Sequence, residues 1–321
     1  MKRFLLAAFL SALAFHTAGA EDKVWRHGLL EAKADAGFMT MVARGFDHAR
    51  GLKVELVQFK NDIAPMQGLL AGELDSFEGG TQGAIVAAGR GADVKILGCH
   101  YPGLPHGIFV RGAIEKPADL KGKTLAISAP RSFPDVFAHA VLAKYGVPAE
   151  EVHFANLGSD VDRFKAIAAG VADAGVISSE YLPIAKAQGV RLLVAGREVL
   201  PNYLRTCIMS SGKSLAARHD DAVHFLAAEM DAIRYTLSHR EETIKRTQEM
   251  TQVKPDDPRP AFLYDDAVKN HDVDPELGVP MEKLAWLEKL VIELGQLPTP
   301  YDVAKATDLS IRQEALALVK K

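Results

Sequence analysis

The sequence has few cysteines and few tryptophans, with two of each among its 321 residues. Cys99 and Cys207 lie too far apart in the chain to form a CxxC motif, so neither a zinc site nor a dithiol redox site is supported. Trp25 and Trp286 argue against a tryptophan cage for a quaternary ammonium ligand, because such a cage needs several aromatic faces around one cation.

The common catalytic signatures are absent as well. The chain contains no GxSxG, no HExxH, no Walker loop and no GxGxxG motif. Its 11 histidines show no spacing typical of metal ligands. We therefore expect no catalytic residues, no metal and no cofactor, and predict that the protein is not an enzyme.

Positive charge does not dominate the chain. It has 38 Lys and Arg residues against 41 Asp and Glu, a formal net charge of −3, and no basic stripe. A surface that binds nucleic acid needs clustered positive charge, so nucleic acid is not an expected partner. No apolar run after the first 20 residues is long enough to span a membrane.

The N-terminus is typical of a secretory signal. Lys2 and Arg3 supply a positive start, and the apolar run at 4–15 is too short to cross a bilayer as a mature helix. Residues 18–20 (Ala-Gly-Ala) form a small-x-small cleavage site. We expect residues 1–20 to be a signal peptide that is removed after Ala20, and the mature chain to reach the periplasm of a bacterium.

The most informative positive feature is a phrase that occurs twice. Residues 69–75 (LLAGELD) are echoed by 167–173 (IAAGVAD). Each copy has the pattern of a helix that ends in a glycine and is followed by a short apolar strand. Asp62 is expected to cap the first of these helices. The echo indicates two related lobes, although chance remains an alternative because helix–glycine–strand joints are common.

Strands and helices alternate through the first two thirds of the chain, a pattern typical of an α/β fold with sheets covered on both faces. We predict two lobes, each a mostly parallel sheet flanked by helices. The expected boundaries are 21–112 for the first part of lobe 1 and 113–202 for lobe 2. Residues 203–321 should return to lobe 1 and add C-terminal helices that pack on it. A separate helical domain is the alternative for this tail.

Cys99 and Cys207 both fall on predicted strands near the junction of the lobes. Export would permit a disulfide between them. Two separate buried thiols are the favoured interpretation, because the sequence does not supply the Cα–Cα distance that a disulfide requires.

Loops after the strands of open α/β sheets are where such folds bind ligands. Gly79-Gly80-Thr81 begins a predicted helix after such a strand, and the free N–H groups there attract an anion or a carbonyl oxygen. Simple helix capping by Thr81 fits the pattern equally well. Ser159 and the Ser178-Ser179 pair stand at helix starts in the other lobe, where serine is also an ordinary cap.

Two further segments carry candidate contacts. Arg131 suits an anionic ligand and Phe133 suits an aromatic ring, with a solvent-facing arginine as the alternative. His100 and His106 flank a break in the chain between the lobes, where a plain loop role is as well supported. The complete set of candidate ligand-binding residues is Lys33, Gly79, Gly80, Thr81, His100, Arg131, Ser132, Phe133, Ser159, Ser179 and Glu180.

Four phrases in this order resemble a known family: 51–57 (GLKVELV), 70–75 (LAGELD), 117–123 (PADLKGK) and 168–174 (AAGVADA). The chain is similar to the substrate-binding proteins of nitrate/sulfonate/taurine-type ABC importers, a family that also includes binders of thiamine-pyrimidine precursors.

The resemblance covers roughly residues 24–210. It implies a type II-like periplasmic-binding-protein fold, with two lobes that are joined by two crossing strands and close on a small molecule. The family often has a Glu-Pro pair after the second echo, whereas here Tyr181 follows Glu180, which leaves the place of Glu180 in the cleft open. The contacts that the resemblance implies are Gly79, Gly80, Thr81, Arg131, Ser132, Ser159, Ser179 and Glu180.

From this resemblance we expect an exported, monomeric solute-binding protein that delivers a small ligand to an ABC permease. Arg131 and the two helix starts favour an anionic organic solute such as a sulfonate or a carboxylate, or nitrate. Phe133 and the tyrosines leave room for an aromatic acid or a pyrimidine. The alternatives are an enzyme on the same fold that acts on a pyrimidine-like or aromatic acid substrate, and a ligand sensor for a membrane receptor.

Overall fold

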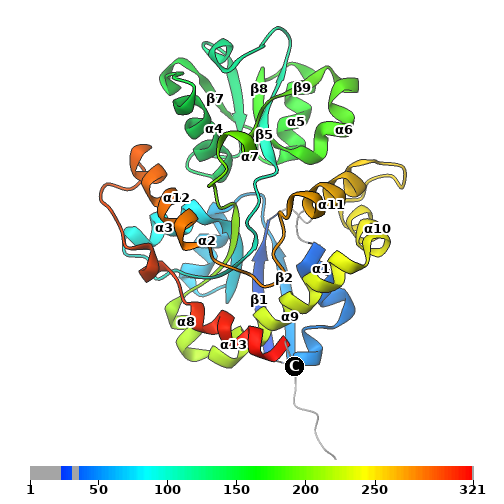
Figure 1. The fold of residues 1–321 in the computed structure, drawn as a ribbon, viewed down its shortest axis with the longest axis vertical. Helices are drawn as coiled ribbons and strands as arrows, with labels where there is room; N and C mark the ends of the chain where they lie inside the picture. The colour runs from blue at the N-terminus through cyan, green and yellow to red at the C-terminus, as the bar shows by residue number, and fades with distance from the viewer. Residues whose placement is uncertain (1–22, 31–35, 320–321) are drawn as a thin grey trace, which may run out of the picture.

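The computed structural model describes residues 23–30 and 36–319. The expected signal peptide and the candidate Lys33 lie outside the described residues. The chain forms two lobes, one above the other in Figure 1, with most of the C-terminal helices beside the lower one. Within the described ranges, no helix combines the length and the apolar character that crossing a membrane requires.

Lobe 1 is built on a five-stranded sheet with the order β2-β1-β3-β10-β4. Strands β2 and β3 pair with β1 in parallel, whereas β10 lies antiparallel between β3 and β4. One strand of this sheet therefore runs against the other four. The strands are β1 (Lys23–Leu29), β2 (Leu52–Gln58), β3 (Ser76–Gly80), β4 (Lys95–Tyr101) and β10 (Thr206–Ser210).

Lobe 2 repeats the plan with the order β7-β6-β8-β5-β9. Strand β6 pairs in parallel with β7 and β8, and β5 lies antiparallel between β8 and β9. The predicted pair of α/β lobes with mostly parallel sheets is confirmed. The strands are β5 (His106–Arg111), β6 (Thr124–Ile127), β7 (His153–Asn156), β8 (Ala174–Ser178) and β9 (Val190–Ala195).

The repeated phrase occupies equivalent places in the two lobes. Gly72 ends α2 (Ile63–Ala71) with φ 78°, and Gly170 ends α5 (Asp160–Ala169) with φ 77°. Residues with a side chain rarely adopt this left-handed conformation, which explains the glycine in both copies. The apolar strands that follow are β3 and β8, and each is the third strand of its sheet.

The chain passes between the lobes in two short segments. Residues 102–105 connect β4 of the first sheet to β5 of the second, and 200–205 lead back to β10. The expected boundary after residue 112 is therefore too late, because β5 pairs with β8 and β9 of lobe 2. The physical break is at Pro102 and Pro105, which interrupt the backbone pairing before β5 begins.

The C-terminal helices share their core with lobe 1. A single buried cluster includes Trp25 of β1, Leu52 of β2, Phe225 of α9 and Ile311 of α13, so this tail is not a separate helical domain. The remaining helices are α1 (Ala36–Arg44), α3 (Thr81–Gly89), α4 (Phe133–Lys144), α6 (Leu182–Ala185), α7 (Gly196–Val199), α8 (Gly212–Ala217), α9 (His219–Ser238), α10 (Arg240–Thr251), α11 (Arg259–Asn270), α12 (Met281–Glu293) and α13 (Leu309–Val319).

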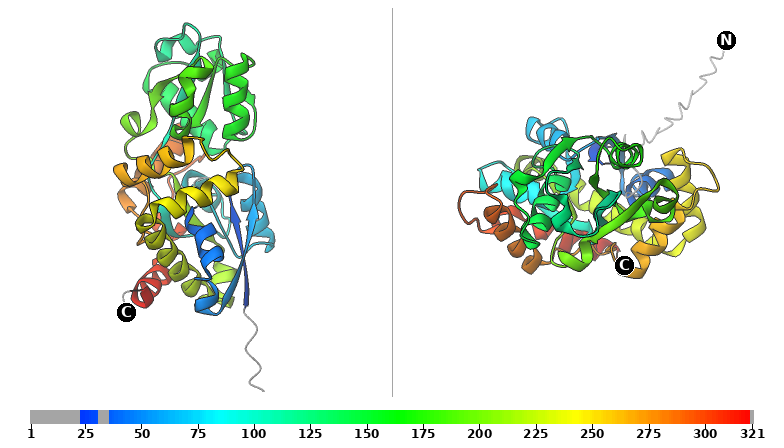
Figure 2. Two further views of the ribbon diagram at one scale, coloured as in Figure 1. Left: turned by 90° about the vertical axis from the view of Figure 1, so that its right-hand side faces the viewer. Right: turned by 90° about the horizontal axis from the view of Figure 1, so that it is seen from above.

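Helix α11 extends from this tail to lobe 2. The side view in Figure 2 places α10 and α11 at the level of the junction between the lobes. Arg197 of α7 forms ion pairs with Asp266 on α11 at 3.0 Å and with Asp272 at 2.5 Å. The Ser179 hydroxyl donates to Asp266 at 3.1 Å. The predicted ligand contact Ser179 is therefore engaged in holding α11 against lobe 2.

Cys99 of β4 and Cys207 of β10 form a disulfide. The expectation of two separate thiols was wrong. The two residues are 108 positions apart in the chain, and they meet because the return strand β10 inserts beside β4. That insertion depends on long-range pairing, which the local sequence does not reveal.

A buried polar cluster joins strands β1 and β3 of the first sheet. The Trp25 indole N–H donates to the Ser76 hydroxyl at 2.8 Å, and the His27 Nδ1 lies 2.7 Å from the same oxygen. Burial lowers the pKa of His27 to about 3, so this imidazole is neutral in the folded protein at neutral pH.

The disulfide should contribute substantially to stability. We expect reduction with a phosphine to lower the free energy of unfolding by about 2–5 kcal/mol, because the reduced unfolded chain regains the freedom that a long closed loop removes. Urea unfolding with and without reductant measures this difference. The Cys99→Ala/Cys207→Ala double variant is the control and should be insensitive to reductant. An unchanged urea midpoint for the reduced wild type would contradict the prediction.

His27 should make the protein less stable in acid. A histidine of the unfolded chain has a pKa of about 6.5, so below that pH the unfolded chain binds a proton that the folded protein does not. We expect the stability advantage of wild type over His27→Gln to shrink by up to about 1.4 kcal/mol per pH unit between about pH 6.5 and 3. Urea unfolding at pH 7, 6 and 5 measures this change. His153→Gln, at the exposed start of β7, is the matched control. Parallel plots of the free energy of unfolding against pH for wild type and His27→Gln would contradict the assignment.

Candidate functional site

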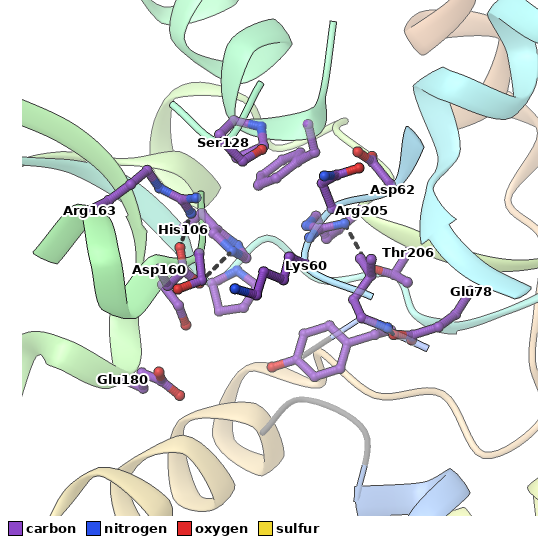
Figure 3. Close-up of a pocket in the computed structure, with 18 of the residues that line it drawn as sticks. Lys60, Asp62, Glu78, His106, Ser128, Asp160, Arg163, Glu180, Arg205 and Thr206 are labelled. Carbon is purple, nitrogen blue, oxygen red and sulfur yellow. Dashed lines mark hydrogen bonds and ion pairs between the residues drawn. The ribbon is translucent and has the colours of Figure 1, made fainter. Parts of the chain in front are cut away.

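A cleft lies between the lobes, and Figure 3 shows its lining. Both sheets, both crossing segments and α11 contribute side chains to it. The described lining residues are Leu30, Lys60, Asn61, Asp62, Glu78, His100, Tyr101, Pro105, His106, Ser128, Phe133, Pro134, Ser159, Asp160, Arg163, Ser178, Glu180, Arg205, Thr206 and Leu263.

Glu78 and His100 form a buried pair on the lobe 1 side. Glu78 stands on β3 and His100 on β4, and the Glu78 Oε2 lies 2.8 Å from the His100 Nε2. The other carboxylate oxygen accepts from the backbone N–H of Leu30 at 2.8 Å. Only 2 % of Glu78 and 4 % of His100 is exposed, so this pair is fixed in the wall of the cleft.

Asp160 and Arg163 form a second pair on the lobe 2 side. Both stand on the first turn of α5, and the Arg163 guanidinium donates to the Asp160 carboxylate and to the carbonyl of Gly158. Its Nε donates to the carbonyl of Val176 at 2.7 Å. The His106 Nε2 lies 3.9 Å from the other Asp160 oxygen, as Figure 3 shows. The donors of Arg163 are therefore directed at acceptors of the protein.

The ring of Phe133 packs on residues 200–205, which we call the return segment because it leads the chain back to lobe 1. The Arg205 guanidinium lies over this ring at 3.8 Å from the centroid, a cation–π contact. Tyr203 meets the ring edge-on at 5.6 Å, and His106 does so at 4.7 Å. Arg205 also donates to the Thr206 hydroxyl at 3.0 Å. The residues of the return segment therefore pack directly on the first turn of α4.

Asp62 does not have the expected role as a helix cap. The side-chain oxygen of Asn61 accepts from the backbone N–H of Ile63 at 3.0 Å and of Ala64 at 3.3 Å, which caps α2 in its place. The Asp62 carboxyl instead lines the cleft, and its Oδ2 accepts from the side-chain amide of Gln82 at 3.4 Å. Burial raises the pKa of Asp62, while the neighbouring Arg205 charge opposes that rise.

Four of the predicted contacts line the cleft: His100, Phe133, Ser159 and Glu180. Ser159 also caps α5, accepting from the backbone N–H of Asp162 at 3.2 Å. Glu180 reaches the cleft although the family's proline does not follow it. His100, Ser159 and Glu180 stand at or near the end of a strand, as the rule for open α/β sheets predicts, and Phe133 begins the helix that follows β6.

The glycine-rich turn does not line the cleft. Gly79 and Gly80 lie within the buried β3, and Gly80 packs so closely on Asp62 that a Cβ there would lie 2.5 Å from the Asp62 Oδ2. The Thr81 backbone N–H donates to the carbonyl of Arg205 at 3.3 Å, and its hydroxyl lies 3.1 Å from the Cys207 sulfur. These residues join the return segment to lobe 1.

Arg131 and Ser132 also lie outside the lining. Arg131 is exposed, with φ 66°, its backbone N–H donates to Asp135 at 2.6 Å, and it is not among the residues that line the cleft. The Ser132 hydroxyl is buried and donates to the carbonyl of Ala129 at 2.6 Å. The arginine and one of the helix starts on which the anionic expectation rested therefore do not face the cleft.

Sequence reasoning missed most of the charged lining. Lys60 and Asp62 follow β2, so the strand-end rule would have found them if it had been applied to that strand as well. Arg163 extends from a helix and Arg205 stands on the return segment, and no local motif identifies either. The described residues contain no group of three or more histidine, cysteine or acidic side chains arranged to hold a metal ion.

Solved structures of binding proteins share the whole fold. The chain is 22% identical to the alkanesulfonate-binding protein SsuA of Xanthomonas axonopodis pv. citri, solved with bound MOPS, with a TM-score of 0.75 over 91% of this chain and 100% of that one. The periplasmic nitrate-binding protein NrtA of Synechocystis PCC 6803 is 14% identical, with a TM-score of 0.76 over 94% and 90%. A structure from Bordetella bronchiseptica RB50 is 18% identical, with a TM-score of 0.80 over 94% and 99%.

No curated protein matches the chain in sequence. The family model described as NMT1/THI5 like matches residues 34–243, which is more than half of the chain. This match and the shared fold agree with the resemblance seen in the sequence, and the chain belongs to the NMT1/THI5-like family.

Proposed function

We propose that this protein is the solute-binding component of an ABC importer, which captures a small polar organic solute between its lobes and delivers it to a permease. The observation that carries the proposal is the cleft, whose lining comes from both lobes and from both segments that join them. A solute held by both lobes binds the closed arrangement more tightly than an open one, so binding favours closure.

The joining segments suit such a movement. Each is short: 102–105 joins β4 of the first sheet to β5 of the second, and 200–205 joins α7 of lobe 2 to β10 of the first sheet. Rotation confined to a few residues at such points is the usual hinge in two-lobe binding proteins. A permease would then recognise the closed pair of lobes.

The other expectations fit this proposal. The chain would act in the periplasm after removal of residues 1–20, as a monomer and without catalysis. The Glu78–His100 pair is the feature that favours an enzyme as the second candidate, because a carboxylate beside an imidazole is a common acid–base arrangement. A sensor that presents its closed lobes to a membrane receptor would use the same cleft.

Ligand binding should be detectable as a thermal shift. We expect one solute class in a panel of sulfonates, carboxylates, nitrate, amines and pyrimidines to raise the melting temperature of the purified protein by a few degrees. A ligand at one hundred times its Kd adds about 2.7 kcal/mol of stability. Native mass spectrometry of the same sample detects a solute that co-purifies, and chromatography after overnight incubation should recover the ligand unchanged. A chemically altered ligand would support the enzyme instead.

A side chain that fills the cleft should abolish binding whatever the ligand is. We expect Ser128→Phe to lose the thermal shift, because Ser128 lines the cleft and a phenyl ring there would occupy the space of the solute. Ser310→Phe, an exposed position at the start of α13, is the matched control and should keep the shift. Equal shifts in both variants, with both folded by circular dichroism, would place the ligand outside the cleft.

A further inference from the structure

We propose that the solute of the cleft carries an apolar group, an alkyl chain or an aryl ring, which passes Tyr101 into a second, apolar chamber among the C-terminal helices, while the Tyr101 hydroxyl hydrogen-bonds to the polar part of the solute. This inference rests on the proposed function and deepens it, since it names the class of solute that the cleft takes.

The chamber lies among four helices of lobe 1, beside the cleft. Helix α9 packs on α1 and α10, and α10 packs on α11, so the four lie next to one another in Figure 1. Most of the side chains that line the chamber are buried. Its apolar lining includes Ile233 of α9, Leu263 and Ala267 of α11, and Val273.

The polar residues of the chamber add little polarity to it. The hydroxyls of Thr236, Thr243 and Thr247 already donate to backbone carbonyls of α9 and α10, at distances between 2.8 and 3.1 Å. Glu229 is the one carboxyl in the described lining. It packs so closely on Gly37 that a Cβ there would not fit, so it lies at the end of the chamber formed by α1. The surface left for a solute is mainly apolar.

The chamber adjoins the cleft. His100, Tyr101 and Leu263 line both spaces, so the two meet at these side chains. Protein interiors are closely packed, and an apolar space that no side chain fills lowers stability in proportion to its volume. Water gains little there, because an apolar wall offers it few hydrogen-bond partners. An apolar group of the solute that enters from the cleft would fill the space at no such cost.

The Tyr101 hydroxyl is an independent observation that points to a ligand. Tyr101 ends β4 and is only 5 % exposed, and its buried hydroxyl has no hydrogen-bond partner among the residues that the structure describes. A buried hydroxyl without a partner is costly. Burial raises the pKa of Tyr101 well above its ordinary value, and the nearby Asp272 carboxylate adds to the rise, so the hydroxyl keeps its proton at neutral pH. It is therefore a donor held ready where cleft and chamber meet.

These observations define an order along the solute. Its polar end lies among the charged residues of the cleft, an acceptor atom lies at the Tyr101 hydroxyl, and its apolar end lies among α9, α10 and α11. A compact inorganic ion such as nitrate or sulfate has no group for the chamber. The preferred solute is therefore an amphipathic molecule with one polar end.

The first test varies the apolar group at a constant polar group, by titration calorimetry on the wild-type protein. The short and long probes are ethanesulfonate and hexanesulfonate, propanoate and heptanoate, and ethylamine and hexylamine, with benzenesulfonate, benzoate and benzylamine as aryl members. For the polar group that binds, we expect the hexyl or aryl member to bind at least tenfold more tightly than the ethyl member, because each buried methylene contributes about fourfold. Equal affinities of short and long members, or a co-purified solute without an alkyl or aryl group, would overturn the inference.

The second test fills the chamber. Ala267 is buried and lines the chamber but not the cleft. We expect Ala267→Phe to reduce the ratio of hexyl to ethyl affinity at least fivefold and to leave the affinity of the ethyl member as in wild type. Ala216→Phe, at an exposed position on α8, is the matched control and should keep the wild-type ratio. An unchanged ratio in Ala267→Phe would place the apolar group elsewhere. Ala267→Leu is a smaller change in the same direction, and circular dichroism shows whether each variant is folded.

The third test removes the Tyr101 hydroxyl. We expect Tyr101→Phe to weaken binding of the short and long probes alike by about tenfold or more, the effect of losing a hydrogen bond to a charged group. The urea midpoint of the ligand-free variant should be no lower than that of wild type, because the ring remains and the hydroxyl has no partner among the described residues. Tyr145→Phe, on the exposed end of α4, is the matched control. Wild-type affinities in Tyr101→Phe, or a lowered midpoint without ligand, would refute the role of Tyr101.

The two proposals fail in different ways. A wild type that binds no probe and carries no co-purified solute would count against the solute-binding function, and the chamber would lose its solute with it. A wild type that binds short and long members equally well would keep the solute-binding function and overturn the role of the chamber.

Discussion

The architecture depends on two strands, β5 and β10, each of which the chain forms directly after it crosses from one lobe to the other. Strand β5 begins after the first crossing and lies between β8 and β9, and β10 follows the second crossing and lies between β3 and β4. The sheet of lobe 2 is continuous only when β5 is in place, and the sheet of lobe 1 is continuous only when β10 is in place. Because both inserted strands start at the junction, the loops that surround them converge there, and the cleft forms between the sheets.

The chemistry of the cleft follows from the need to compensate buried charge. A carboxylate removed from water is stable only beside donors or cations, and the lining meets this need in three different ways. His100 and a backbone N–H hold Glu78, the guanidinium of Arg163 holds Asp160, and the side-chain amide of Gln82 and the nearby Arg205 charge serve Asp62.

The local sequence predicted the lobes because local rules govern them. A helix that ends in a left-handed residue needs glycine, so Gly72 and Gly170 identify equivalent joints in the two lobes. The same rules failed where long-range contacts decide. Asn61 and Asp62 are both good capping residues, and the local sequence does not show that Asn61 caps α2 while Asp62 lines the cleft. Arg131 looked like a ligand contact, but it is exposed and does not line the cleft, and the partner of Cys99 is defined by a strand 108 residues later.

The disulfide has a mechanical consequence. Cys99 lies two residues before the end of β4 and Cys207 one residue after the start of β10, so the covalent bond joins the two strands at the base of both crossing segments. The two segments therefore leave lobe 1 from strands that are covalently joined, and the bond restrains the movement of one segment relative to the other. Reduction of this bond removes the one covalent link between the two strands, so it would loosen the point from which both segments leave lobe 1.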